Sequence, residues 1–318
     1  MLAAKTYPVK QMKNLPKSFK LSKEIRSALE KSRPVVALES AVITHGLPHS
    51  HNLLLARELE EIVRREGAAA ATIAILDGRV CVGLEVDELK RLATLKQPLK
   101  LSCRDLAGAI AAKASGGTTV AGTLRLIAQV GIHVFATGGI GGVHRGGHWD
   151  VSADLAELAK QQVLVVCAGA KAILDLPATL EQLETLGVPV IGYQTGEFPA
   201  FYSIESGLPT SATVDTEAQA IGLARAHWVL GGAGLLLACP PPKGSALPRL
   251  QVEGWIGVAL EEAMEKKIAG PAITPFLLQR VNELSGAKSL EANLALLKNN
   301  ARIAARVVMK SGEKRKGL

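Results

Sequence analysis

Three residues with chemically useful side chains directly follow apolar runs that are typical of buried strands. Glu39 comes after VVAL, Thr137 after VFA, and Lys171 after VVCAGA. A carboxyl group can act as a general acid, and a lysine that loses its hydration becomes neutral and can attack a carbonyl carbon. If these strands share one sheet, their ends converge and the pattern indicates Schiff-base chemistry on a sugar. Taken singly, a glutamate there is also a common helix cap or ion-pair partner, and a lysine a common solvated residue.

A glycine-rich segment, TGGIGGVHRGG, begins at Thr137 and contains His144 and Arg145. It does not fit the dinucleotide fingerprint Gly-x-Gly-x-x-Gly, because the third glycine is displaced and no acidic residue lies at the ribose position. Successive glycine N–H groups, with a threonine hydroxyl and a basic side chain, can bind a phosphate. A tight turn that needs positive φ angles is the alternative. We predict a phosphate nest here.

Polar residues at a spacing of two, Asp150, Ser152 and Asp154, lead into a predicted helix. Two interpretations are open. Ser152 or Asp154 caps the helix, since short polar side chains accept hydrogen bonds from the first N–H groups. Alternatively, one carboxylate with ordered waters holds a hard divalent ion such as Mg²⁺ or Mn²⁺.

The elements that must position these residues alternate along most of the chain. Apolar runs typical of buried strands occupy 34–40, 69–78, 133–139, 163–169, 188–193 and 234–240. Amphipathic helices are predicted over 52–66, 104–114, 123–130, 152–160, 176–186 and 216–230, and the last third is helical. Such alternation requires crossover connections. We therefore expect an α/β fold: a mostly parallel sheet with helices on both faces, α-β-α layered, and a helical C-terminal part.

Composition narrows the class of protein further. The chain has 318 residues, of which 48% are hydrophobic, enough for a substantial core, whereas aromatic residues make up only 3%. With so few aromatic residues we expect no base-stacking surface and no nucleic-acid partner. We also expect no membrane partner, because no apolar run reaches the roughly 18 residues that span a bilayer. The four cysteines contain no Cys-x-x-Cys pair. This spacing does not suggest a zinc knuckle or a disulfide framework, and it favours a reducing compartment.

The formal net charge of +8 is concentrated at the ends of the chain. We divide the chain into a basic N-terminal extension with the first helix (1–33), a single α/β domain (34–309) and a basic C-terminal tail (310–318). A cytoplasmic location is expected. An organellar location stays open because no acidic residue precedes Glu24, although this leader lacks arginine and has little serine.

Long motifs in this chain resemble those of the pseudouridine-5'-phosphate glycosidases, also called the indigoidine-synthase-A-like family. The matching segments, in the family's order, are VALESAVITHGLP, GAAAATIAILDG, KLSCRDL, GGTTVAG, VFATGGIGGVHRG, DVSADL, CAGAKAILDLPATLEQLET, EFPAFY and TPFLLQRVNELSG. The resemblance covers the chain from about Pro34 to Arg306. The resemblance implies reversible cleavage of the C–C glycosidic bond of pseudouridine 5'-phosphate to uracil and ribose 5-phosphate, with Mn²⁺ or another divalent cation, in a homotrimer.

The resemblance also assigns roles to individual residues. It makes Lys171 in AGAK the nucleophile, Glu39 in ALES the proton donor and Asp150 in DVSAD the metal ligand. It implies that the substrate-binding residues are Lys100, Val120, Thr137, His144, Ser152, Ala153, Asp154 and Asn293.

One departure from the family's motifs and several other functions leave alternatives to this interpretation. Between HRG and DVSAD this chain has only GHW (147–149), where the family usually carries a longer insertion, which changes the expected pocket shape there. A Schiff-base phosphosugar aldolase or lyase would need the same lysine and phosphate nest, as would a glycosidase of a related C-nucleoside phosphate. A nucleotide-responsive binding module would bind without turnover.

Overall fold

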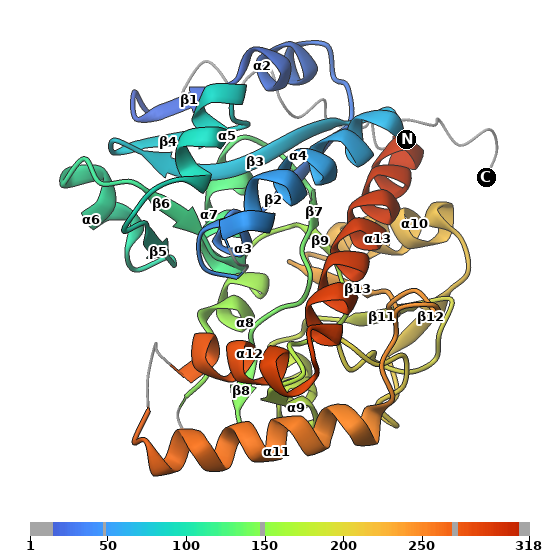
Figure 1. Cartoon of the computed structure of the whole chain (residues 1–318). Helices are drawn as coiled ribbons and strands as arrows, with labels where there is room; N and C mark the ends of the chain where they lie inside the picture. Colours follow the sequence, from blue (N-terminus) through green and yellow to red (C-terminus); the bar gives the residue numbers. More distant parts are fainter. Residues whose placement is uncertain (1–14, 47–48, 147–149, 269–272, 312–318) are drawn as a thin grey trace.

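The apolar runs form the strands of one large sheet in the computed structural model, which describes residues 15–46, 49–146, 150–268 and 273–311 (Figure 1). Its strands are β1 (Phe19–Leu21), β2 (Val35–Leu38), β3 (Ala69–Leu76), β4 (Arg79–Val82), β5 (Leu99–Leu101), β6 (Gly116–Thr118), β7 (Val134–Ala136), β9 (Leu164–Cys167), β11 (Val190–Tyr193), β12 (Ala212–Val214) and β13 (Leu235–Ala238). A separate antiparallel pair consists of β8 (Val143–His144) and β10 (Leu174–Asp175).

The order of the strands is β1-β4-β3-β2-β7-β9-β13-β11-β12, and β6 joins β3 to β5. Neighbours from β3 through β2, β7, β9, β13 and β11 to β12 are parallel. Antiparallel pairing occurs where β3 meets β4 and β6. The sheet is therefore mixed but mostly parallel, as predicted.

Helices connect these strands and pack against the sheet. They are α2 (Lys23–Glu30), α3 (Ala41–His45), α4 (His49–Arg65), α5 (Val86–Ala93), α6 (Leu106–Ala111), α7 (Val120–Gln129), α8 (Ala153–Leu158), α9 (Leu176–Thr185), α10 (Glu217–Val229), α11 (Arg249–Glu265), α12 (Ile273–Leu284) and α13 (Lys288–Ser311). Helix α13 packs against α4, α10 and strands β2, β7 and β9, whereas α7 packs against α8 and strands β2, β3 and β6. The α/β fold class and the helical C-terminal part are confirmed.

Helix α7 begins three residues earlier than the pattern predicts. We expected it to start at Thr123, but Thr119 is the N-cap and its hydroxyl accepts a hydrogen bond from the N–H of Gly122 at 3.2 Å. A threonine cap satisfies one of the first free N–H groups, so the helix starts directly after it. Val120 therefore occupies the first turn of α7.

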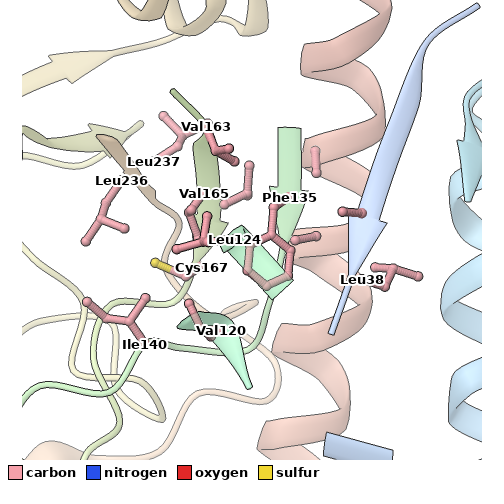
Figure 2. Packing of buried hydrophobic residues seen from close by; sticks show 14 of the residues in the cluster. Leu38, Val120, Leu124, Phe135, Ile140, Val163, Val165, Cys167, Leu236 and Leu237 are labelled. Atoms are coloured by element: carbon pink, nitrogen blue, oxygen red, sulfur yellow. The ribbon is translucent and has the colours of Figure 1, made fainter. Parts of the chain in front are cut away.

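The core lies where β7 and β9 meet α7, as Figure 2 shows with Phe135, Val165 and Leu124. Phe135 and Leu124 are fully buried. Side chains that are buried on both faces of a strand explain why the central runs are continuously apolar. This packing holds the ends of β2, β7 and β9 in fixed positions.

The described part of the predicted N-terminal extension is built into the sheet. Strand β1 pairs in parallel with β4, and Leu21 and Ile25 are buried in the main hydrophobic cluster. At the other end, α13 continues to Ser311, past the predicted start of the tail. In the described ranges no helix is long and apolar enough to cross a membrane.

Candidate active site

The ends of β2 and β7 bring Glu39 and Thr137 together. These strands are parallel neighbours, with Leu38 paired to Ala136, so the residues that follow lie at the same edge of the sheet. The hydroxyl of Thr137 donates a short hydrogen bond to Oε1 of Glu39. Thr137 itself is 1% exposed. A predicted convergence of strand ends is thus realised as a direct contact.

Lys171 reaches the same edge from β9, the neighbour of β7. Its N–H donates to the carbonyl of Ile140 at 3.0 Å, and the N–H of Ile140 donates to the carbonyl of Gly169 at 3.0 Å. These two bonds tie the segment after β9 to the glycine-rich loop after β7. The backbone that carries Lys171 is therefore fixed relative to Thr137 and Glu39.

A cavity of ≈ 70 Å³ joins the ionisable groups. Glu39, Lys100, Lys171 and Asn293 line it, together with Gly138 and Gly139 of the loop and apolar residues of α12 and α13. An adjoining hollow of ≈ 470 Å³ shares Asn293 and further residues with it. Drug-sized ligands usually occupy sites of about 300–1,000 Å³, so a nucleotide would extend from the small cavity into the adjoining space.

Burial raises the pKa of the Glu39 carboxyl. Lys171, the hydrogen bond from Thr137 and Lys100 act in the opposite direction, and the nearby Asp154 raises the pKa further. The loss of hydration therefore outweighs the two ammonium groups. A carboxyl that keeps its proton to higher pH is suited to general-acid chemistry.

Lys100 comes to the cavity on β5, at the side of the sheet where β5 pairs with β6. Loss of hydration lowers the pKa of its ammonium group, and the positive charge of Lys171 lowers it further. Glu39 and Asp154 partly oppose this shift. Two lysines thus flank one carboxyl group, which gives the cavity an excess of positive charge that suits a phosphorylated ligand.

His144 and Asp150 are not among the residues that line this cavity, but His144 is near enough for the charges of Lys171 and Lys100 to act on it. Desolvation lowers the pKa of His144, Asp150 raises it, and the ammonium groups of Lys171 and Lys100 lower it again. Nδ1 of His144 is 3.9 Å from Oδ2 of Asp150. The side chain of Asp150 is 50% exposed.

The residues around Asp150 could hold a metal ion through few protein ligands only. Within the described ranges no three His, Cys, Asp or Glu side chains gather closely enough to hold an ion. A single exposed carboxylate fits an ion that keeps most of its waters, as Mg²⁺ and similar hard cations do. The neighbouring residues 147–149, at which the resemblance led us to expect a changed pocket shape, lie outside the described residues.

In the structure the motif DVSAD supplies a helix cap and a carboxylate that links two backbone segments. Ser152 caps α8, since its hydroxyl accepts from the N–H of Asp154 at 3.2 Å, and Ala153 is exposed in the first turn. Asp154 is 5% exposed, and its carboxylate accepts from the N–H of Ala121 and of Gly141, both at 2.8 Å. Asp154 therefore joins α8 to the start of α7, beside the buried Val120, and to the glycine loop.

Several hydrogen-bond donors of the glycine loop bond within the protein, and the phosphate nest stays a prediction. The Thr137 hydroxyl bonds to Glu39, and backbone N–H groups along the loop donate within the protein, from Thr137, Ile140, Gly141, Val143 and His144. Donors that are already satisfied do not bind an anion without losing these bonds.

Close packing explains two of the loop glycines. A Cβ on Gly139 would lie 2.6 Å from Cδ2 of Phe201, and one on Gly141 would lie 2.6 Å from Cβ of Ser152. Real Cβ atoms do not approach side chains this closely. These glycines therefore let Phe201 and the start of α8 pack directly on the loop.

His45 is a cavity residue that the sequence analysis did not single out. It lines both hollows, and its Nδ1 is 2.7 Å from the hydroxyl of Thr44. Desolvation and the charge of Lys100 lower its pKa. The sequence could have indicated this residue, because His45 lies in the motif VALESAVITHGLP and ends the short helix that follows Glu39.

The sheet and these side chains define an α/β protein with one carboxyl group and two lysines in a shared cavity. The family model described as "Indigoidine synthase A like protein" matches residues 24–310. A protein of Caldanaerobacter subterraneus subsp. tengcongensis, named pseudouridine-5'-phosphate glycosidase, is 52% identical over 292 residues, covering 91% of this chain and 95% of that protein. A Staphylococcus aureus protein of the same name is 48% identical over 302 residues, covering 94% and 98%. The chain belongs to the indigoidine synthase A-like family, as its motifs predicted.

Two solved structures share the fold. An indigoidine synthase A-like protein from Thermotoga maritima superposes with a TM-score of 0.85 at 33% identity, covering 93% of this chain and 97% of that one. The prealnumycin C-glycosynthase AlnA, solved in complex with ribulose 5-phosphate, gives a TM-score of 0.86 at 39% identity, covering 93% and 98%.

Proposed function

We propose that this protein is a pseudouridine-5'-phosphate glycosidase, which cleaves the C–C glycosidic bond between uracil and ribose 5-phosphate. The observation that carries the proposal is the meeting of Glu39, Lys100, Lys171 and Asn293 in one cavity. Relatives about half identical over nearly the whole chain have this name. A relative of the same fold was solved with a five-carbon sugar phosphate, which supports a ligand of this class.

The first chemical step opens the ribose ring. Nζ of Lys171 attacks C1′ of the sugar while the C1′–O4′ bond breaks, and Glu39 gives its proton to O4′. The raised pKa of Glu39 favours the protonated state that this step needs. The product is an open-chain amine adduct in which C1′ still bears uracil through C5.

The second step breaks the carbon–carbon bond. Nζ first gives a proton to the Glu39 carboxylate, so its lone pair can form an iminium with C1′ while the electron pair of the C1′–C5 bond leaves with uracil. Glu39 then gives this proton to C5 of uracil. Water then hydrolyses the iminium to ribose 5-phosphate and regenerates Lys171. Each step is reversible, so uracil and ribose 5-phosphate would also combine.

Asp150 would hold the divalent cation, with water completing its coordination. When bound, Mn²⁺ or a similar ion supplies positive charge that stabilises negative charge on the base. Lys100 binds the phosphate, and His144 and Asn293 bind and orient the rest of the substrate. The homotrimer that the family resemblance implies remains a prediction, which sedimentation of the purified protein would test.

The direct test is synthesis in the reverse direction. Purified protein with uracil, ribose 5-phosphate and Mn²⁺ should form a nucleoside monophosphate whose C–C bond resists acid, detected by mass spectrometry. Lys171→Ala should abolish the product, whereas Lys160→Ala, which removes an exposed lysine at the end of α8, should not. Cleavage of sugar phosphates without any nucleobase would instead support the aldolase or lyase alternative.

A further inference from the structure

Helix α13 contacts the end of β7 through a fully buried asparagine. Nδ2 of Asn300 donates to the carbonyl of Thr137 at 2.8 Å and to that of Gly138 at 3.3 Å. Asn300 is 0% exposed. Two carbonyl groups fix the orientation of the amide, because the flipped amide would place oxygen against oxygen. Neither the motifs nor the catalytic roles assigned above include this residue.

The two carbonyls belong to the residues that form the active-site edge. Thr137 donates its hydroxyl to Glu39, and Gly138 lines the cavity. A Cβ on Gly138 would lie 3.2 Å from Cδ2 of Leu297, so α13 packs closely against this peptide. The contacts therefore form one chain, from Asn300 through the backbone of Thr137 to the carboxyl of Glu39.

One face of α13 carries both the residues that line the cavity and the asparagine that contacts the end of β7. Asn293, Leu297 and Asn300 follow the i, i+4, i+7 spacing that places residues on one side of a helix. Asn293 and Leu297 line the cavity, and Asn300 holds the strand end. The helix thus contributes a cavity residue and a backbone contact from the same surface.

We propose that Asn300 is a positioning residue, which holds the backbone of Thr137 so that the Thr137 hydroxyl stays on Glu39. The inference rests on the proposed function only for what Glu39 does, and not for the contact itself. Oδ1 of Asn300 has no hydrogen-bond partner among the described residues, so the amide interacts with the protein through its N–H groups alone. The unpaired acceptor makes this a costly place for an asparagine unless its N–H groups are needed.

The expected effect has a defined sign. The hydrogen bond from Thr137 lowers the pKa of Glu39, so its loss should raise that pKa. The charged groups that act on Glu39 are Lys171, Lys100 and Asp154, and His45 lines the same cavity. Helix α13 brings only uncharged side chains to the cavity, so a shift on changing Asn300 is not the loss of a nearby charge.

Asn52 provides a matched control. It is 2% exposed, and its Nδ2 donates to two backbone carbonyls, those of Ile43 at 3.1 Å and Ala93 at 3.0 Å. Its Oδ1 accepts from the N–H of Leu53 at 2.6 Å, and none of these three bonds involves Thr137 or Glu39. Asn52→Leu should therefore lose a similar pair of buried hydrogen bonds, and similar stability, without changing the acid.

The experiment measures the pKa of Glu39 directly, by ¹³C NMR titration of labelled glutamate carboxyls with the signal assigned by Glu39→Gln. Asn300→Leu and Thr137→Val should both raise this pKa, Asn52→Leu should leave it unchanged, and adding Asn300→Leu to Thr137→Val should shift it no further. Asn300→Ser, which leaves space for a water, serves if the leucine variant does not fold, and should also raise the pKa.

A wild-type pKa in both Asn300 variants, with a fall in melting temperature like that of Asn52→Leu, would show a merely structural role and overturn the inference. Failure of the proposed function would appear separately, as a wild-type protein without glycosidase activity in which the same pKa shifts are still measured.

Discussion

Thr137 and Glu39, which follow neighbouring parallel strands, are joined by a hydrogen bond from the threonine hydroxyl to the glutamate carboxyl. Two lysines face the same carboxyl group, yet its pKa is raised because burial outweighs them. Burial therefore favours the protonated form of Glu39, against the effect of the two nearby lysines.

Replacing this acid should stabilise the protein at neutral and alkaline pH. A carboxyl whose folded pKa lies above its unfolded value contributes stability at low pH, which is lost as pH rises through the folded pKa. Glu39→Gln removes that loss and should raise the free energy of unfolding at pH 8 by about 0.5–2 kcal/mol, the range common for a single stabilising substitution. At pH 4 the difference should vanish. Thermal melts at both pH values measure this, and an equal difference at both would contradict it.

Activity should depend on the proton of Glu39. Because the acid must be protonated to open the ribose, kcat/KM should fall as pH rises through its pKa. Thr137→Val should move this alkaline limb to higher pH while lowering the maximum, since the pKa rises and the acid is less well oriented. The pH profiles of wild type and variant provide the measurement. An unchanged limb would mean that another group controls the fall.

Lys171 should form the covalent intermediate. Borohydride added during turnover should trap an adduct with the mass of the reduced sugar phosphate, and Lys171→Ala should eliminate it. Glu39→Gln should slow trapping at least about 100-fold, within the 10²–10⁴-fold range typical of general-acid catalysis.

Lys100 is the internal control for that assignment. It lines the same cavity, and desolvation and Lys171 lower its pKa, so it is also suited to losing a proton. Peptide mapping should nevertheless place the adduct on Lys171. An adduct on Lys100 would reverse the two roles, and an active enzyme that yields no adduct would exclude the imine route.

The phosphate of the substrate should contribute strongly to binding. Two charge-assisted hydrogen bonds at about 1.5–3 kcal/mol each predict that pseudouridine without phosphate is at least about 100-fold poorer in kcat/KM. Lys100→Met should shrink this ratio, whereas Lys90→Met, at an exposed lysine of α5, should not. Equal kcat/KM for the two substrates would remove phosphate recognition from the proposal.

The aspartates of DVSAD should separate stability from metal dependence. Asp154→Asn places an amide donor against one of two backbone N–H groups and should cost about 1–3 kcal/mol of stability. Asp150→Ala, at an exposed side chain, should leave the melting temperature unchanged and remove most of the Mn²⁺-dependent activity. Full wild-type activity in excess chelator would contradict the metal assignment.

The sequence by itself determined where the central strands lie along the chain and that they are buried, because residues buried on both faces of a parallel sheet must be apolar throughout. It also determined that Glu39, Thr137 and Lys171 follow strands, which places them at one edge once the strands are parallel. Long motifs identified the family, which the comparisons confirm.

Only the tertiary structure decided what the polar groups bond to. The Thr137 hydroxyl bonds to Glu39, and Asp154 joins two backbone segments, and the sequence indicated neither of these partners. Asn300 gave no signal in the sequence, because its partners lie more than a hundred residues away along the chain. Hydrogen bonds depend on directions and distances between separate elements. These are fixed only when β2 pairs with β7, α8 packs against α7, and α13 packs against the end of β7.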